Sequence, residues 1–173
     1  MTTRSDFPSG LSVCMVSVML IVLRHGQTQW NVEPRRCQGQ LPVELNDVGR
    51  RQALEVADSM DMPDVLYSSH LLRARQTAEI LIESIAKRTS APIPEHRIDE
   101  RLAEVHCGEW QGEWFDDLKK RYPEAWQSLS KDELVFRFPG GESFAQVLER
   151  FRESLTELDR IHSEATVLVV THG

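Results

Sequence analysis

Four side chains that can carry positive charge stand where the strands of a parallel sheet are expected to end. Arg24 and His25 follow the first predicted strand. Arg73 lies in the first turn of the helix after the second strand, and His172 follows the last strand. In parallel sheets the ligand site lies beyond the carboxyl ends of the strands. Because guanidinium groups bind dianions through paired hydrogen bonds, the sequence predicts a pocket for a small dianion, with phosphate as the leading candidate.

The residues around these side chains follow the alternating pattern that such a sheet requires. Three short apolar runs are typical of buried parallel strands, at residues 19–23, 65–67 and 166–170. Four helical stretches are expected, after the caps Asn46 and Ser69, over about 115–129, and from near Ser143. Because strands alternate with helices, right-handed crossovers and a mostly parallel sheet are implied. We therefore predict an α/β fold, a three-layer sandwich with a mostly parallel central sheet flanked by helices.

Composition limits the classes of function. The chain has 173 residues, with 20 Lys and Arg against 27 Asp and Glu, and a net charge of -7. An acidic chain has no general field for polyanions, so we expect no nucleic acid partner. The apolar run at 11–23 is too short to span a bilayer, so we expect no membrane partner. The scattered Cys14, Cys37 and Cys107 fit neither a disulfide framework nor a zinc cluster, and they favour a reducing, cytoplasmic setting.

One domain accounts for most of the chain, because no repeat or low-complexity linker divides it. We expect this domain to cover residues 19–173. Residues 1–18 are expected to be an N-terminal tail or the product of a mis-assigned start, with Met15 and Met19 as alternative first residues.

Four separated blocks of sequence resemble a known family. They are LRHGQT at residues 23–28 with Asn31 after it, LRARQTA at 72–78, LAEVHCGEWQG at 102–112, and THG at 171–173. In type and order these blocks are similar to those of the histidine phosphatase superfamily, in its phosphoglycerate mutase-like branch. The resemblance extends from about residue 19 to the end of the chain. Members of this family continue beyond the second histidine, so the resemblance implies a domain that is incomplete at its C-terminal end.

The resemblance also implies a role for each block. His25 is the residue that becomes phosphorylated, and Glu104 is the proton donor. The phosphoryl group is held by Arg24, Asn31, Arg73 and His172, and His172 is counted with the catalytic residues. Asn31 either binds phosphate or orients its loop.

The implied roles have a physical logic. A neutral imidazole is a good nucleophile toward phosphorus, and it divides one slow hydrolysis into two easier displacements. Neighbouring cations keep His25 neutral because they lower its pKa, and they offset charge on the phosphoryl oxygens in the transition state. The leaving ester oxygen needs a proton, which Glu104 supplies if its pKa is raised, and Trp110 is a candidate apolar wall for it.

Five further residues are candidate substrate contacts: Gln27, Thr28, Arg35, Arg36 and His106. Arg35 and Arg36 either reach a substrate carboxylate or second phosphate, or are simply solvated. His106 is either a substrate contact or a loop residue. We expect no metal and no cofactor, because the chain has no Cys-x-x-Cys, His-Glu-x-x-His, Asp-rich or P-loop pattern.

The leading hypothesis is a phosphomonoesterase that hydrolyses a small phosphorylated metabolite through a phosphohistidine intermediate. A phosphoglycerate mutase-type phosphoryl transfer is an alternative, but it needs an enclosing insertion. Only about thirty residues separate Gln111 from Phe144, which favours hydrolysis. A second alternative is a truncated, non-catalytic phosphate-binding protein. The partner in each case is a small-molecule phosphate ester or phosphate, and the oligomeric state is left open, with a homodimer among the options.

Overall fold

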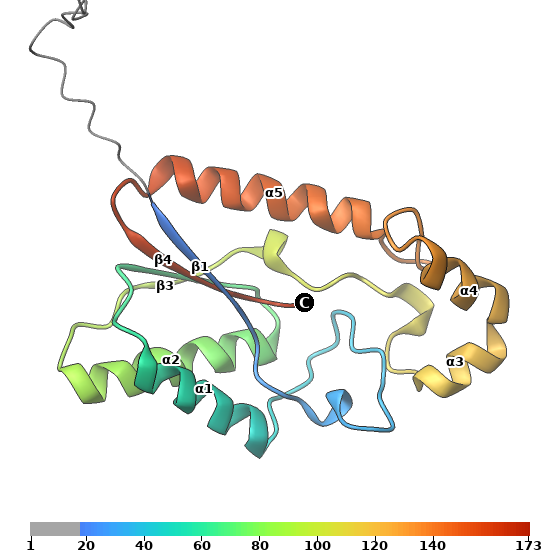
Figure 1. The fold of residues 1–173 in the computed structure, drawn as a ribbon, viewed down its shortest axis with the longest axis horizontal. Helices are drawn as coiled ribbons and strands as arrows, with labels where there is room; N and C mark the ends of the chain where they lie inside the picture. The colour runs from blue at the N-terminus through green and yellow to red at the C-terminus, as the bar shows by residue number, and fades with distance from the viewer. Residues whose placement is uncertain (1–17) are drawn as a thin grey trace, which may run out of the picture.

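The computed structural model describes residues 18–173 and contains a parallel sheet between helices (Figure 1). Its strands are β1 (Met19–Arg24), β2 (Val65–Ser68), β3 (His96–Ile98) and β4 (Thr166–Thr171). They are ordered β1-β4-β2-β3, and every pairing is parallel. The predicted α/β fold is confirmed. The tail expected over residues 1–18 lies, as far as residue 17, outside the described residues.

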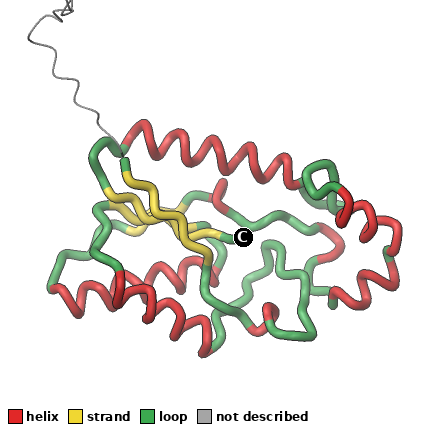
Figure 2. The backbone as a smooth tube through the Cα atoms, viewed as in Figure 1, coloured by secondary structure: helices red, strands yellow, loops and turns green. Residues whose placement is uncertain are grey.

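The helices cover both faces of the sheet, as Figure 2 shows. They are α1 (Asp47–Ser59), α2 (Leu72–Thr89), α3 (Phe115–Arg121), α4 (Pro123–Lys131) and α5 (Phe144–Ile161). Short 3-10 turns are η1 (Gln29–Asn31), η2 (Glu100–Leu102) and η3 (Gly108–Trp110). In Figure 1, α5 lies along one face of the sheet, and α1 and α2 lie along the other. This arrangement is the predicted three-layer sandwich.

The central strand β4 divides the core between the two faces. Leu168 and Val170 are buried in the cluster that includes α1 and α2 residues, whereas Val167 and Val169 are buried in the cluster that includes Leu158 of α5. Successive side chains of a strand point to opposite faces, so one apolar run can serve both. The continuous run at 166–170 is therefore explained by burial on two sides.

Two predicted helix starts are confirmed and one is wrong. Asn46 caps α1 by accepting from the amide of Gly49 at 2.9 Å, and Ser143 forms a capping box with Gln146 at the start of α5. Ser69 does not cap α2, because that helix starts at Leu72 with Leu71 as its cap residue. The Ser69 hydroxyl instead accepts from the amide of Leu71 within the preceding turn.

The single helical stretch expected over 115–129 is two helices. The break falls at Tyr122, between the end of α3 and the start of α4 at Pro123. Proline has no N–H and clashes with the preceding turn, so it can begin a helix but disrupts one that is under way. Strand β3 was not predicted, because its three residues follow two prolines and include no continuous apolar run.

Helices α3 and α4 lie beyond the end of the sheet (Figure 1). Their side chains contribute to a cluster rich in aromatic residues. Trp110 is fully buried there, and its ring stacks on Tyr122 and Trp126 with centroids 5.9 and 6.0 Å apart. Trp110 and Val105 flank the loop that follows Glu104, so this cluster supports one side of that loop. None of the helices in residues 18–173 combines the length and apolarity that a bilayer crossing needs.

Because β4 is buried on both sides, truncation of one of its side chains is expected to destabilise the fold. Leu168→Ala is expected to lower the free energy of unfolding by about 2–5 kcal/mol, because it leaves a cavity between the sheet and its helices. Leu148→Ala is the control, since Leu148 is 57% exposed on α5, and its effect is expected to stay within about 0.5 kcal/mol. Equilibrium urea unfolding measures both. Similar losses in the two variants would contradict this account of the core.

Candidate active site

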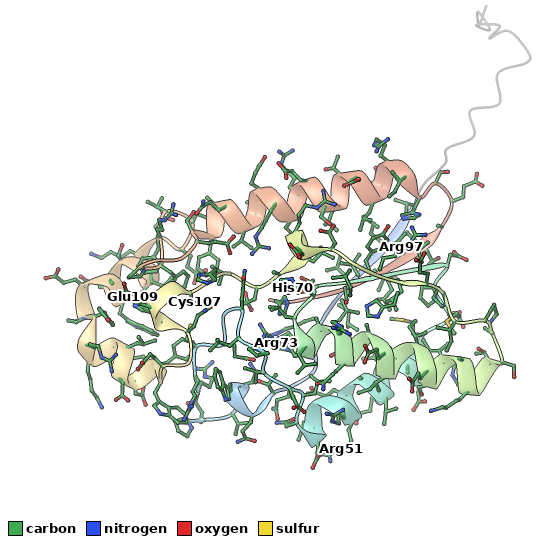
Figure 3. All side chains as sticks on the ribbon, turned by 180° about the vertical axis from the view of Figure 1, so that it is seen from behind. Arg51, His70, Arg73, Arg97, Cys107 and Glu109 are labelled. Carbon is green, nitrogen blue, oxygen red and sulfur yellow. The ribbon has the colours of Figure 1, made fainter. Side chains whose placement is uncertain are left out.

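The structure brings His25, Arg73 and His172 together at the carboxyl ends of β1 and β4. Parallel pairing places Arg24 opposite Thr171, so the residues that follow these two strands are neighbours. The ring centroids of His25 and His172 are 5.1 Å apart. Arg73 enters from the first turn of α2 (Figure 3), and its Nε donates to Nε2 of His25 at 3.2 Å. Three side chains that are distant in sequence thus form one cluster.

The hydrogen bonds of His25 define its tautomer. Its Nδ1 lies 2.7 Å from the carbonyl oxygen of Gly26, which can only accept, so Nδ1 carries the proton. Arg73 Nε can only donate, so Nε2 carries the lone pair. Burial, and then the charges of Arg73 and Arg24, lower the pKa of His25 to about 4, against the opposing Gly26 hydrogen bond. At neutral pH the ring is therefore an uncharged group with a basic nitrogen directed at Arg73.

Arg73 is a buried cation held by backbone. Its side chain is inaccessible to solvent, and Nη2 and Nη1 donate to the carbonyl oxygens of Gly39 and Leu41 at 2.8 and 3.2 Å. Burial lowers its pKa to about 10, so the guanidinium stays charged at neutral pH. Within residues 18–173 no carboxylate lies in ion-pair distance of it. A buried charge without a counterion favours an anionic ligand.

His172 presents two unpartnered nitrogens to the same cluster. Both Nδ1 and Nε2 are buried and have no hydrogen-bond partner among the described residues. Burial, followed by the charge of Arg73, lowers the pKa of His172 far below its ordinary value. An unsatisfied buried polar group costs roughly 1–3 kcal/mol, so a ligand that accepts a hydrogen bond from this ring recovers part of that energy.

Two cavities open beside the cluster. One, of about 350 Å³, is lined by polar side chains: Arg24, His25, Gln27, Asn31, Arg35 and Gln52. The other, of about 300 Å³, is lined by Glu104 and Arg36 together with the apolar side chains of Trp110, Phe115 and Phe138. Arg24, Asn31 and Arg35 line both cavities. A ligand at His25 therefore has a polar space on one side and a largely aromatic one on the other.

Glu104 lines the aromatic cavity. It follows η2, in a segment without regular secondary structure, and its Oε1 accepts from the amide of Val105 at 3.0 Å. Burial raises the pKa of its carboxyl, although the Val105 hydrogen bond and the charges of Arg73 and Arg24 oppose the shift. A carboxyl whose proton is retained to higher pH can act as an acid.

The loop after β1 is shaped by a close backbone approach and by Asn31. A Cβ on Gly26 would collide with the carbonyl oxygen of Gly49 in the first turn of α1, so only glycine fits there. The Oδ1 of Asn31 accepts from the amide and hydroxyl of Thr28 at 2.9 and 3.0 Å. Asn31 thus orients the loop and also lines both cavities, whereas Thr28 is fully buried. Gln27 lines the polar cavity, and its Oε1 accepts from Asn46.

The side chains of the remaining predicted substrate contacts differ in how firmly other residues hold them. Arg35 is exposed, pairs with Glu33 at 2.7 Å and lines both cavities. Arg36 is held in place, because its guanidinium stacks 3.7 Å from the centroid of Trp114. The Nδ1 of His106 accepts from the amide of Gly108 at 3.2 Å, and His106 is absent from the residues that line the two cavities.

Several groups that line the site or position its residues are not predicted by the sequence analysis. Gln52 lines the polar cavity and accepts from the amide of Gln27, and the carbonyls of Gly39 and Leu41 position Arg73. Nothing in their residue types marks these contacts, because backbone carbonyls are common to every residue. For Gly49 the sequence offers one signal of a close contact: a glycine in the first turn of the predicted helix that follows the RHG block. Within residues 18–173 no three His, Cys, Asp or Glu side chains are grouped to hold a metal ion.

Comparison with known proteins gives a consistent result. The family model of the histidine phosphatase superfamily (branch 1) matches residues 20–173. Phosphoglycerate mutase-like protein 4 from Arabidopsis thaliana is 37% identical over 158 residues, which cover 89% of this chain and 66% of that protein. Metal-independent phosphoserine phosphatase from Arabidopsis thaliana is 33% identical, with 89% of this chain and 63% of that protein covered. The chain thus spans just under two thirds of the length of these relatives.

A solved structure with a bound oxyanion is also similar. Mycobacterial glucosyl-3-phosphoglycerate phosphatase, determined in complex with VO3, superposes with a TM-score of 0.74 and 36% identity. The superposition covers 89% of this chain and 75% of that structure.

The neutral histidines set an expected dependence of stability on pH. The folded pKa values of His25 and His172 lie below the ordinary 6.5, so below that pH the unfolded chain binds protons that the folded chain does not. The free energy of unfolding is therefore expected to fall as the pH drops from 6.5 toward about 4. Each such proton contributes a slope of about 1.4 kcal/mol per pH unit. Because His172→Asn removes one of these groups, urea titrations should give a shallower slope for this variant than for wild type, and equal slopes would contradict the assignment.

Proposed function

Because the chain belongs to the histidine phosphatase superfamily, we propose that it is a phosphomonoesterase that hydrolyses a small phosphorylated metabolite through a phosphohistidine. The observation that carries the proposal is the neutral His25, whose Nε2 lone pair lies in a buried cationic pocket beside His172. The catalytic residues proposed are His25, Glu104 and His172, within the domain proposed over residues 19–173.

The first step is phosphoryl transfer to His25. A phosphate dianion accepts hydrogen bonds from Arg73, which releases the Nε2 lone pair that Arg73 now contacts. Nε2 then forms a bond to phosphorus while the bond from phosphorus to the ester oxygen breaks. The electron pair of that bond stays on the leaving oxygen, which takes a proton from Glu104 and departs as an alcohol. The carbonyl of Gly26 stabilises the positive charge that develops on the ring through Nδ1.

The second step returns the enzyme to its starting state. Glu104, now a carboxylate, takes a proton from water as the water oxygen attacks phosphorus. The bond from phosphorus to Nε2 breaks, and its electron pair returns to the ring, so inorganic phosphate leaves and His25 is neutral again. Arg24, Arg73 and His172 act in both steps, because each can offset charge on the phosphoryl oxygens.

Features of the two cavities support a small acidic substrate. The exposed pair between Arg35 and Glu33 is of a kind worth only about 0–1 kcal/mol, so Arg35 can exchange Glu33 for an anionic group of a ligand. Arg36 is less free because it is stacked on Trp114. The names of similar proteins, which include a phosphoserine phosphatase and a glucosyl-3-phosphoglycerate phosphatase, point to small phosphorylated metabolites as well.

The setting that we propose is a reducing cytoplasm. Both cysteines among the described residues, Cys37 and Cys107, are buried free thiols, which suits such a compartment. The net charge of -7 disfavours nucleic acid as a partner. A homodimer remains compatible with this proposal.

Removal of the proposed nucleophile gives the first test. His25→Ala is expected to abolish phosphate release from a panel of phosphate monoesters and to abolish an acid-labile, alkali-stable phosphoenzyme. His162→Ala is the control and should keep the wild-type rate. His162 lies at the C-terminal end of α5, where it contacts Tyr67. Assays of phosphate release and of isomer interconversion on the same esters separate a phosphatase from a mutase. Unchanged release by His25→Ala would refute the mechanism.

Removal of the proposed acid gives the second test. Glu104→Gln is expected to lower kcat/KM, which reports phosphoryl transfer to His25 and not the later attack of water, by roughly 10²–10⁴ on alkyl phosphates, because their leaving oxygen needs a proton. The loss on 4-nitrophenyl phosphate should be much smaller, since that phenolate leaves without one. Glu109→Gln is the control, because Glu109 is an exposed carboxylate five residues further along the chain, in η3. Equal losses on both classes of ester would show that Glu104 does not protonate the leaving group.

A further inference from the structure

Arg150 uses every hydrogen on its guanidinium to hold the segment that carries Glu104. It lies on α5, and its Nη1 donates to the carbonyl oxygens of Arg101 and Ala103, each at 2.6 Å. Its Nη2 donates to the carbonyl oxygen of Glu104 and to Oε2 of Glu142, each at 3.0 Å, and its Nε donates to Oε1 of Glu142 at 3.0 Å. Arginine has five N–H donors, so none is left for another partner.

Glu142 completes this contact from the other side. Its Oε2 also accepts from the amide of His106 at 2.8 Å, two residues beyond Glu104. The side chains of Arg150 and Glu142 are only 18% and 24% exposed, so their ion pair is shielded from solvent more than the pairs on the surface. Together the two side chains hold backbone atoms on both sides of Glu104.

The held segment has no regular secondary structure, and besides Arg150 the side chain of Gln40 donates to the carbonyl oxygen of Glu104 at 2.9 Å. Residues 103–107 form neither helix nor strand and connect η2 with η3. Arg150, in contrast, stands in the second turn of an 18-residue helix whose start is fixed by the capping box of Ser143. The rigid helix α5 therefore determines the position of the irregular segment at residues 103–107.

We propose that Arg150 is a positioning residue for the acid step: through Glu142 and the carbonyls around Glu104, it fixes the carboxyl of Glu104 where the leaving oxygen departs. The inference rests on the proposed function, in which Glu104 supplies that proton. All five donors of Arg150 are taken by Glu142 and by backbone carbonyls, so Arg150 acts through Glu104 and not on the substrate.

The dependence of the rate on the leaving group tests this role. In Arg150→Ala, kcat/KM on an alkyl phosphate, which reports the step that releases the alcohol, is expected to fall by ~10²-fold, because small displacements of a catalytic group have effects of this size. The kcat/KM on 4-nitrophenyl phosphate should fall much less, and the inhibition constant of inorganic phosphate should stay near wild type. Arg150→Lys keeps the charge but cannot span all five contacts, so its rates should fall between those of Arg150→Ala and wild type.

A matched control lies two residues along the same helix. Arg152 is 63% exposed, pairs only with Glu149 among the described residues, and contacts no part of the loop. Arg152→Ala is expected to match wild type on both esters. In the double variant Arg150→Ala/Glu104→Gln, the rate on the alkyl phosphate should equal that of Glu104→Gln alone, because a residue that acts through Glu104 adds nothing once Glu104 is gone.

The outcomes separate the inference from the function on which it rests. Equal losses on both esters in Arg150→Ala, or additive losses in the double variant, would overturn the positioning role. If Arg150→Ala does not fold, Glu142→Gln tests the same contact and must show the same dependence on the leaving group. If the wild-type protein releases no phosphate from any ester, the proposed function fails. Amide exchange then still tests the contact with the loop, because protection at residues 103–107 must drop in the Arg150 variants and not in Arg152→Ala.

Discussion

The contact between Arg73 and His25 is the constraint on which the rest of the site depends. A guanidinium buried without a carboxylate is costly, and here it is held by two carbonyls of the first loop and by the lone pair of a histidine. Burial and, after it, this same charge keep both histidines neutral, since both lower the pKa of His25 and of His172. A carboxylate beside Arg73 would relieve the charge, but it would also compete with an anionic ligand. In the function that we propose, the site therefore tolerates local instability in return for selectivity toward phosphate.

In the proposed mechanism, the two ends of the substrate are held by different kinds of structure. The phosphoryl end meets His25, Arg73 and His172, which lie at strand ends or in the first turn of a helix, where the ladder of the sheet fixes the backbone. The leaving-group end meets Glu104 and Arg35, which lie on loops and are placed by side-chain contacts. This division allows the loops to change with the substrate while the phosphoryl chemistry stays unchanged.

The sequence was sufficient for the parts of the molecule that depend on local pattern. Continuous apolar runs marked three of the four described strands, and parallel topology then brought His25 and His172 together without further assumption. The break at Pro123 is also a matter of local pattern, because a proline can begin a helix but disrupts one that is under way. Strand β3 could not be found, because three residues at a sheet edge lack a periodic signal. The roles of Arg150 and of the Gly39 carbonyl were also hidden, since long-range contacts to backbone leave no mark on residue type.

In the proposed mechanism, the charge on the ring of His25 links the architecture to the order of the two chemical steps. Before transfer, the ring must be neutral, and burial with two nearby arginines ensures this. During transfer, the ring gains positive charge, which the same arginines oppose. Two features compensate: the incoming phosphoryl group brings negative charge, and the Gly26 carbonyl accepts from Nδ1 at 2.7 Å. Because Gly26 must also pass against Gly49 without a Cβ, the glycine that follows the histidine serves both the close packing of α1 and the electrostatics of the intermediate.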